Sequence, residues 1–344
     1  MPTWGEILIE MQSARRPDGT PDFDAVRRKY MRQLHARTHR AVILYATAFL
    51  EDRPIPPSGV QVGLGDIQGF MEAVSNIEER QLDLILHSPG GSAEAAESIV
   101  AYLRQRFDHI RVFIPVAAMS AATMIALAAN EVVMGQHSQL GPIDPQFIIA
   151  TPEGPRSAPA RAILKQFEMG KLQCKDPGNL AAWMPILRSY APGLLTQCED
   201  SQRLAETMVS SWLQQYMFAG QPNAADEAAR IAHWFGDYDN FSSHGRRVGY
   251  DQAREVGVEV HRLEDDNDLQ DAVLSVHHAA MQSFGGSAIK IIENHHGRTW
   301  AKHAGEIVIA QPGPRPTQQG PQVAQPAPVN RQERRAQERG RGGR

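Results

Sequence analysis

Short apolar runs alternate with helix-length amphipathic stretches through the first part of this 344-residue chain. The runs are rich in Val, Ile and Leu, which is typical of strands buried on both faces of a sheet. They cover residues 41–46, 82–86, 110–116 and 131–134. Between the second and third runs, Ile99, Leu103 and Phe107 recur at helical spacing. The alternation predicts βαβ units, a largely parallel sheet and an α/β fold.

The pattern changes outside this core and predicts five segments. Residues 1–21 are mixed and turn-rich, so we expect a loosely held lead-in, and a basic amphipathic helix follows from Phe23 to His35. A turn-rich loop at 151–155 precedes helical stretches. The predicted segments are the lead-in and its helix over 1–40, the α/β core over 41–150, a mainly helical insert over 151–240, a returning part of the fold with a helix and a hairpin over 241–311, and a disordered tail over 312–344.

Two motifs at the ends of core strands carry the candidate chemistry. Ser88-Pro89-Gly90-Gly91 follows the second apolar run, where Pro89 ends the strand and the two glycines allow positive φ and close approach to a ligand. Their N–H groups could form an anion-binding concavity. Ser120 opens a helix of small residues after the third run, so we expect its hydroxyl at a helix N-terminus, where the dipole favours negative charge. Ser120 could instead serve only as a helix cap.

The chain has a serine that opens a helix of small residues about thirty positions after Ser-Pro-Gly-Gly. In this pair of motifs it resembles the Clp/crotonase superfamily. The chain is most similar to the SppA type and to the Clp-fold serine proteinases of the serine dehydrogenase proteinase family. The resemblance is densest from Leu82 to Asp144, and weaker similarity, as at 23–44 and 241–265, extends it over most of the chain before the tail. It implies a ClpP/crotonase-like core of stacked βαβ units, peptidase activity and assembly into a homo-oligomer.

The resemblance also assigns roles to four residues. Ser120 would be the nucleophile that forms an acyl-enzyme, and such a serine needs a base and donors for the oxyanion. The backbone N–H groups of Gly91 and Ala121 would be those donors, and Gly90 would shape the turn. The pair Ala121-Ala122 is a departure, because many SppA-type relatives have two glycines directly after the nucleophile.

A ClpP-like Ser-His-Asp triad is not supported by the sequence. In the ClpP type a histidine lies about twenty-five residues after the serine, and that position here falls near Asp144 and Pro145. His137 is close in sequence but is expected to lie a strand's length from the required place.

The SppA type uses a lysine base, which must be desolvated or near positive charge to be neutral. Lys165 is the preferred candidate here, and Lys171 and Lys175 are the alternatives. Arg161 falls near the place where related membrane-associated proteases have their lysine, but an arginine stays charged and cannot act as a base.

Composition narrows the class of protein. Hydrophobic residues make up 42% and charged residues 22% of the chain, and no apolar run approaches the roughly 20 residues of a membrane span. The N-terminus shows no basic segment followed by an apolar stretch, so we expect a cytoplasmic protein with Cys174 and Cys198 reduced.

No phosphate-binding loop occurs, and five histidines near the C-terminus match no compact ligand spacing, so neither a cofactor nor a metal is expected. These histidines are His277, His278, His295, His296 and His303.

The tail differs chemically from the body. From Pro312 onward it holds seven Arg and two Glu, a net charge of +5, which leaves −9 for the remainder of a chain whose total is −4. Pro, Gln, Gly and Arg dominate, so no core can form there. We expect such a tail to contact RNA, a membrane surface or an acidic partner. A plain solubilising role is the alternative.

These expectations favour a serine peptidase that cleaves peptides or proteins through a Ser120 acyl-enzyme, with a lysine as general base. Two alternatives stay open. Acyl-CoA hydratases and hydrolases of the crotonase type share the fold, and in them the glycine turn would hold a thioester oxyanion. A catalytically silent oligomeric scaffold could use the same fold for assembly and the basic tail to bind nucleic acid or a partner protein.

Overall fold

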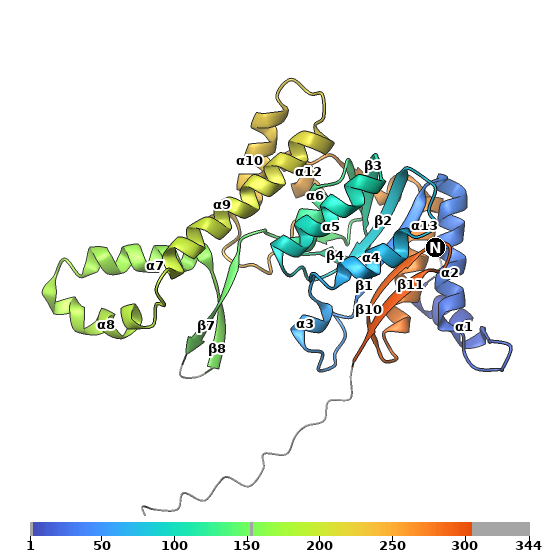
Figure 1. The fold of residues 1–344 in the computed structure, drawn as a ribbon, viewed down its shortest axis with the longest axis horizontal. Coiled ribbons are helices and arrows are strands. Elements are labelled where there is room, and N and C mark those ends of the chain that lie inside the picture. The colour runs from blue at the N-terminus through green and yellow to red at the C-terminus, as the bar shows by residue number, and fades with distance from the viewer. Residues whose placement is uncertain (1–2, 152–153, 305–344) are drawn as a thin grey trace, which may run out of the picture. The chain divides into compact units, whose positions relative to one another are not determined.

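A seven-stranded sheet forms the centre of the computed structural model, which describes residues 3–151 and 154–304 (Figure 1). Its strands are β1 (Ala41–Thr47), β2 (Gln81–His87), β3 (His109–Ile114), β5 (Glu131–Met134), β9 (Val260–Arg262), β10 (Ala288–Asn294) and β11 (Thr299–His303). Their order is β11-β10-β1-β2-β3-β5-β9. The five strands from β1 to β9 run parallel, and β10 and β11 extend the β1 edge in antiparallel fashion. The α/β class and the largely parallel sheet are confirmed.

Alternate side chains of the central strands enter two separate apolar cores. Ile43 and Tyr45 of β1 join one core, which is completed by helices of the motif region and of the insert. Val42 and Leu44 join the other, which is completed by the first two helices and the last one. Figure 1 shows α4 and α5 over one face of the sheet and α2 and α13 over the other. Both faces are therefore covered, as the apolar strands require.

The helices alternate with the core strands and then dominate the insert. They are α1 (Trp4–Ser13), α2 (Phe23–Thr38), α3 (Pro57–Val60), α4 (Asp66–Val74), α5 (Ala93–Arg106), α6 (Ala121–Leu127), α7 (Ala160–Gln173), α8 (Leu180–Arg188), α9 (Leu194–Trp212), α10 (Ala224–Gly236), α11 (Tyr238–Phe241), α12 (Tyr250–Val256) and α13 (Asn267–Ser283). A π-helical turn over Leu213–Met217 continues α9, and 3₁₀ turns lie at Pro177–Asn179 and Leu263–Asp265.

The N-terminal segment is more ordered than the sequence predicts. Residues 4–13 form α1, and the loosely held lead-in expected there is wrong. Thr3 and Glu6 form a capping box at its start, and Ile7 and Met11, one turn apart, are fully buried in the core that includes α2 and α13.

Two small strand pairs flank the sheet. β4 (Ala117–Ala118) pairs with β6 (Gln139–Leu140), and β7 (Gln146–Thr151) pairs with β8 (Gly154–Pro159) in an antiparallel hairpin. The sequence predicts only a turn-rich loop at the second place. Pro155 and Pro159 cannot donate to a ladder and so argue against a strand, but an edge strand of a two-stranded sheet tolerates them.

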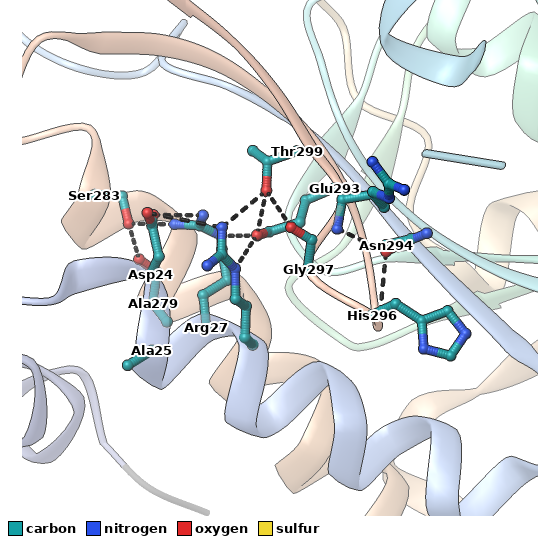
Figure 2. Close-up of polar contacts among 12 residues, drawn as sticks. Asp24, Ala25, Arg27, Ala279, Ser283, Glu293, Asn294, His296, Gly297 and Thr299 are labelled. Atoms are coloured by element: carbon teal, nitrogen blue, oxygen red, sulfur yellow. Dashed lines mark hydrogen bonds and ion pairs between the residues drawn. The ribbon is translucent and has the colours of Figure 1, made fainter. Parts of the chain in front are cut away.

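The C-terminal hairpin is fixed to α2 by a buried ion pair. Nε of Arg27 donates to Glu293 at 2.5 Å (Figure 2). Nε of Arg28 donates to the other carboxylate oxygen at 2.6 Å. Arg27 and Glu293 are 1% and 0% exposed. Thr299 of β11 donates its hydroxyl to the same carboxylate. The hairpin expected at 289–301 is therefore present as β10 and β11, and it is part of the central sheet.

No helix within residues 3–151 and 154–304 is long and apolar enough to cross a membrane. The predicted disordered tail over 312–344 lies outside the described residues, as do the last residues of the predicted 241–311 segment.

Candidate functional site

The two motifs meet because the chain that leaves β2 runs beside the chain that enters the Ser120 turn. Ser88 N–H donates to the carbonyl of Ala117 at 3.0 Å, and Met119 N–H donates to the carbonyl of Ser88 at 3.0 Å. These bonds form a parallel bridge between Ser88 and Ala118. The ends of neighbouring parallel strands thus bring the glycine pair next to the serine, at the edge where α/β sheets bind ligands.

Ser120 has the backbone of a strained strand-to-helix turn. Its φ of 53° and ψ of −121° lie in a region that non-glycine residues rarely adopt. Such a conformation costs about 1–3 kcal/mol and is found mainly where function requires it. Ser120 precedes α6, yet its hydroxyl makes no capping bond to the helix. The geometry resembles a turn that presents a nucleophile more than a simple cap.

Two backbone N–H groups beside Ser120 are available to an oxyanion. Ala121 is the first residue of α6, where an N–H has no partner within its own helix. Gly91 N–H has no acceptor among the described residues either, although its neighbours are bonded: Val62 N–H donates to Gly90 at 2.7 Å and Ser92 N–H donates to Val62 at 3.0 Å. Both predicted donors therefore flank the serine with unused hydrogen-bonding capacity.

A buried cluster anchors residues 61–66, the segment that supports Gly91. Nζ of Lys290 donates to the carbonyl of Gln61 at 2.7 Å and to both carboxylate oxygens of Asp66. Tyr45 donates its hydroxyl to Asp66 at 2.8 Å. Burial lowers the pKa of Lys290, while the Asp66 carboxylate opposes that shift. The cluster fixes residues 61–66 and, through Val62, the turn at Gly91.

The other side of the serine turn is held by Thr123. Its buried hydroxyl donates to the carbonyl of Ala118 at 2.7 Å and accepts from Gly141 N–H at 3.0 Å. α6 is thereby tied to both strands of the β4–β6 pair, and Ala121 and Ala122 are buried beneath the turn.

Ser120 opens into a cavity of about 600 Å³. The first motif, α5, α6, the β7–β8 hairpin, α9 and the loop before α12 all contribute to its wall. Its lining includes Gly91, Ser120, Ala121 and the apolar side chains of Met124, Ile143, Phe147, Ile148 and Leu204, together with Asp144 and His244. The predicted nucleophile and both predicted oxyanion donors thus face one cavity, and Gly90 lies directly behind them.

An Asp–His pair that the sequence does not reveal lies in the same cavity. Nδ1 of His244 is 2.7 Å from Oδ1 of Asp144, although the two residues are 100 positions apart. Asp144 is 1% exposed, and the His244 side chain is 28% exposed. The amide of Gln146 donates to the second carboxylate oxygen of Asp144 at 2.7 Å. A buried carboxylate therefore orients an accessible imidazole in the cavity that Ser120 also lines.

The predicted lysines lie elsewhere on the insert. Lys165 of α7 is 49% exposed, bonds to Asp239 and is not among the residues that line the cavity. This hydrogen bond lowers the pKa of Asp239. Lys171 pairs with Glu168 on the helix surface, and Lys175 is exposed. The structure therefore does not bring any of these amines to Ser120.

One cluster among the histidines has the residue types of a metal site. His35, Glu79 and His295 place their ligand atoms within 4.8 Å of one another. The two imidazole rings, however, stack with centroids 4.0 Å apart and planes 15° from parallel. A metal ion lies in the plane of each imidazole that binds it, so two stacked rings cannot share one ion without reorienting. The arrangement fits a stacked pair better than a metal centre.

Residues 25–179 match the family described as ClpP-like SDH-type serine proteinase. The matched segment contains Gly90, Gly91, Ser120, Ala121 and Asp144, so the resemblance to Clp-fold serine peptidases and the ClpP-like fold are confirmed. His244 lies beyond it.

Two curated proteins similar to this chain are uncharacterized proteins of Methanocaldococcus jannaschii. One is 28% identical over 186 residues, which are 54% of this chain and 58% of the relative. The other is 45% identical over 70 residues, which are 20% of this chain and 24% of the relative. The chain thus matches less than two thirds of the length of either relative.

Two solved structures of a membrane-bound stomatin-specific protease are also similar. One has 17% identity and a TM-score of 0.35, covering 62% of this chain and 79% of that chain. The other, a complex with a substrate peptide, has 16% identity and a TM-score of 0.36, covering 62% and 75%. These scores are too low to support a conclusion about the activity of this chain.

Proposed function

We propose that this protein is a serine peptidase that cleaves peptides or proteins through an acyl-enzyme on Ser120. The observation that carries the proposal is the shared cavity in which Ser120, on its strained turn, is flanked by the free N–H groups of Gly91 and Ala121. The match of residues 25–179 to a family of ClpP-like serine proteinases supports the same chemistry.

The reaction has two halves. In the first, Oγ of Ser120 attacks the scissile carbonyl carbon and its proton passes to a general base, while the N–H groups of Gly91 and Ala121 stabilise the oxyanion. Collapse of the intermediate breaks the C–N bond, and the base returns the proton to the leaving amine. In the second half, water takes the place of the amine and releases the acyl group from Ser120.

The cavity walls favour an extended peptide with a large apolar side chain near the cleaved bond. Met124, Phe147 and Leu204 provide a mainly apolar wall, and an apolar side chain gains about 25 cal/mol for each Å² that it buries. Glu94 is the one acid besides Asp144 on the lining.

The resemblance to the SppA type makes Lys165 a candidate general base. For Lys165 to serve, α7 would have to release Asp239 and bring the amine into the cavity of Ser120 or of a second copy. We propose that the protein forms homo-oligomers, which is supported by large apolar side chains exposed on the insert. They are Met169, Leu172, Leu180 and Met184.

Hydrolysis of unstructured peptides by the purified protein, beside Ser120→Ala, tests the proposal. The wild type should cleave next to large apolar residues, and Ser120→Ala should reduce the rate by about 10⁴-fold or more. Cleavage that persists in Ser120→Ala would contradict the proposal. If an acyl-CoA thioester is consumed and peptides are not, the crotonase-type alternative is favoured instead.

A further inference from the structure

The geometry points to His244, oriented by Asp144, as the general base that activates Ser120. This inference rests on the proposed role of Ser120 as nucleophile and assigns the proton acceptor for that reaction. It gives the chain a Ser-Asp-His order, with the histidine contributed by the loop between α11 and α12.

The three side chains come from separate elements and line one cavity. Ser120 lies at the start of α6, Asp144 lies in the connection between β6 and β7, and His244 lies in the loop before α12. Asp144 is almost fully buried, and a buried carboxylate is tolerated only when its oxygens are satisfied. His244 and Gln146 satisfy one oxygen each at 2.7 Å.

This pairing determines which nitrogen of His244 carries the proton. An ionised carboxylate can only accept, so Nδ1 must donate to Oδ1 of Asp144. The neutral imidazole then has its lone pair on Nε2, which has no hydrogen-bond partner among the described residues. The hydroxyl oxygen of Ser120 accepts no capping bond from α6, so the helix does not hold it in place. Catalytic hydrogen bonds of this kind often tighten only when substrate binds.

The proton balance of the reaction is complete with these residues. As Oγ of Ser120 bonds to the carbonyl carbon, its proton moves to Nε2, and the imidazolium so formed is stabilised by Asp144. When the C–N bond breaks, Nε2 returns that proton to the leaving amine. The same cycle deprotonates the water that hydrolyses the acyl-enzyme, so no lysine and no external reactant other than water is needed.

The cavity contains few other groups that could titrate. Of the residues on its lining, Glu94, Asp144 and His244 are ionisable. A hydrogen bond from Ser92 lowers the pKa of Glu94, so this carboxyl stays ionised near neutral pH. Next to His244 on its own loop, Arg246 donates to the carbonyl of Phe241. A histidine base titrates between pH 5 and 8, whereas an ordinary lysine titrates near 10.4.

The test measures the rate of fluorophosphonate labelling of the full chain from pH 5 to 10, in the wild type and four variants. His244→Gln and Lys165→Met remove the two candidate bases. Asp144→Asn keeps a hydrogen bond to His244 but donates it, which moves the imidazole proton to Nε2 and leaves no lone pair for Ser120. His244→Ala is measured with and without added imidazole. Thermal unfolding confirms that each variant folds.

We expect labelling of the wild type to rise through one ionisation between pH 5 and 8. His244→Gln and Asp144→Asn should slow it by about 10²- to 10⁴-fold. Imidazole should partly restore His244→Ala, and Lys165→Met should match the wild type. If the wild type is labelled and His244→Gln is labelled at the same rate, or Lys165→Met is labelled slowly, this inference is overturned and Ser120 remains the nucleophile. Folded wild type that is not labelled at all would overturn the proposed function and this inference together.

Discussion

Gly90 and Ser120 are packed against each other so closely that no side chain fits between them. A Cβ at Gly90 would lie 2.7 Å from Cβ of Ser120 and 2.3 Å from the carbonyl oxygen of Met119. Gly90 also has a φ of 86°, in the region that favours glycine. The absence of a side chain at Gly90 is therefore required for the backbone turn at Ser120.

Gly90→Ala should disrupt the serine turn. The added methyl group would meet backbone atoms, which cannot rotate away as a side chain can, and the positive φ adds strain. We expect peptide hydrolysis to fall by at least about 10²-fold, since misplacement by about 1 Å has that effect. Gly65→Ala is the control, because an added Cβ there meets nothing within 4 Å and φ is −63°. Equal activity of the two variants would contradict the packing argument.

Leu204 should influence which side chain the cavity accepts. It lies on α9, lines the cavity and is 42% exposed. Leu204→Glu should lower the rate on peptides with large apolar residues and raise the relative rate on peptides with Lys or Arg at the same position. Cleavage of a peptide library followed by mass spectrometry measures this preference. Met71→Glu, at an exposed position of α4 away from the lining, should leave the preference of the wild type unchanged.

The meeting of the two motifs was predictable because its information is local. Ser88-Pro89-Gly90-Gly91 and Ser120 each follow a short apolar run, and the ends of neighbouring parallel strands meet at one edge of a sheet. The α/β class, the core helices and the glycine pair beside Ser120 all follow from spacing within about 60 residues.

The partner of Asp144 was not predictable in this way. His244 lies 100 residues later, in a polar turn whose sequence shows no periodic hydrophobic pattern. Its position depends on the path of the whole insert between the two residues. Asp144 itself marked the place where a ClpP-like histidine is missing. The β7–β8 hairpin was missed for a different reason, because its prolines and half-exposed residues lack the pattern of a core strand. The position of His244 and the pairing of β7 with β8 both depend on tertiary contacts, which the local sequence pattern does not encode.

Glu293→Gln should destabilise the fold without changing the lining of the Ser120 cavity. Burial alone would lower the pKa of Arg27, but the carboxylates of Glu293 and Asp24 raise it, so the guanidinium stays charged (Figure 2). Removal of the Glu293 charge leaves the buried Arg27 with only the partly exposed Asp24 as a carboxylate partner, and should lower the free energy of unfolding by up to about 3–5 kcal/mol.

Urea denaturation measures this loss, and Glu72→Gln is the matched control. Glu72 forms an ion pair with Arg298 at 3.3 Å, and both side chains are more than 40% exposed. A surface pair of this kind contributes about 0–1 kcal/mol. Equal losses in the two variants would contradict the role assigned to the buried pair.

The stability of the protein should fall as the solution becomes acidic, in part because of His87. Burial lowers the pKa of His87 from its ordinary 6.5 to about 3. Between those values the unfolded chain binds a proton that the folded chain does not, so the free energy of unfolding decreases as pH falls through this window. The slope is about 1.4 kcal/mol per pH unit for one such group.

His87→Leu should reduce this slope between pH 6 and pH 4, measured by urea denaturation at each pH. His87 lies between the rings of Phe49 and His277, at centroid distances of 4.8 and 4.9 Å, so a leucine remains in apolar surroundings. His137→Leu, at an exposed position, provides the comparison. A slope in His87→Leu equal to that of the wild type would exclude His87 as a source of the acid sensitivity.

The central claim is that Ser120 is an activated nucleophile, and the site of covalent labelling tests it most directly. The full-length protein is treated with a fluorophosphonate, its intact mass is measured, and the modified residue is located by peptide mapping beside Ser120→Ala. The account predicts one adduct per chain, on Ser120, and none in the variant. An adduct on another residue, or no adduct on a folded wild-type protein, would contradict it.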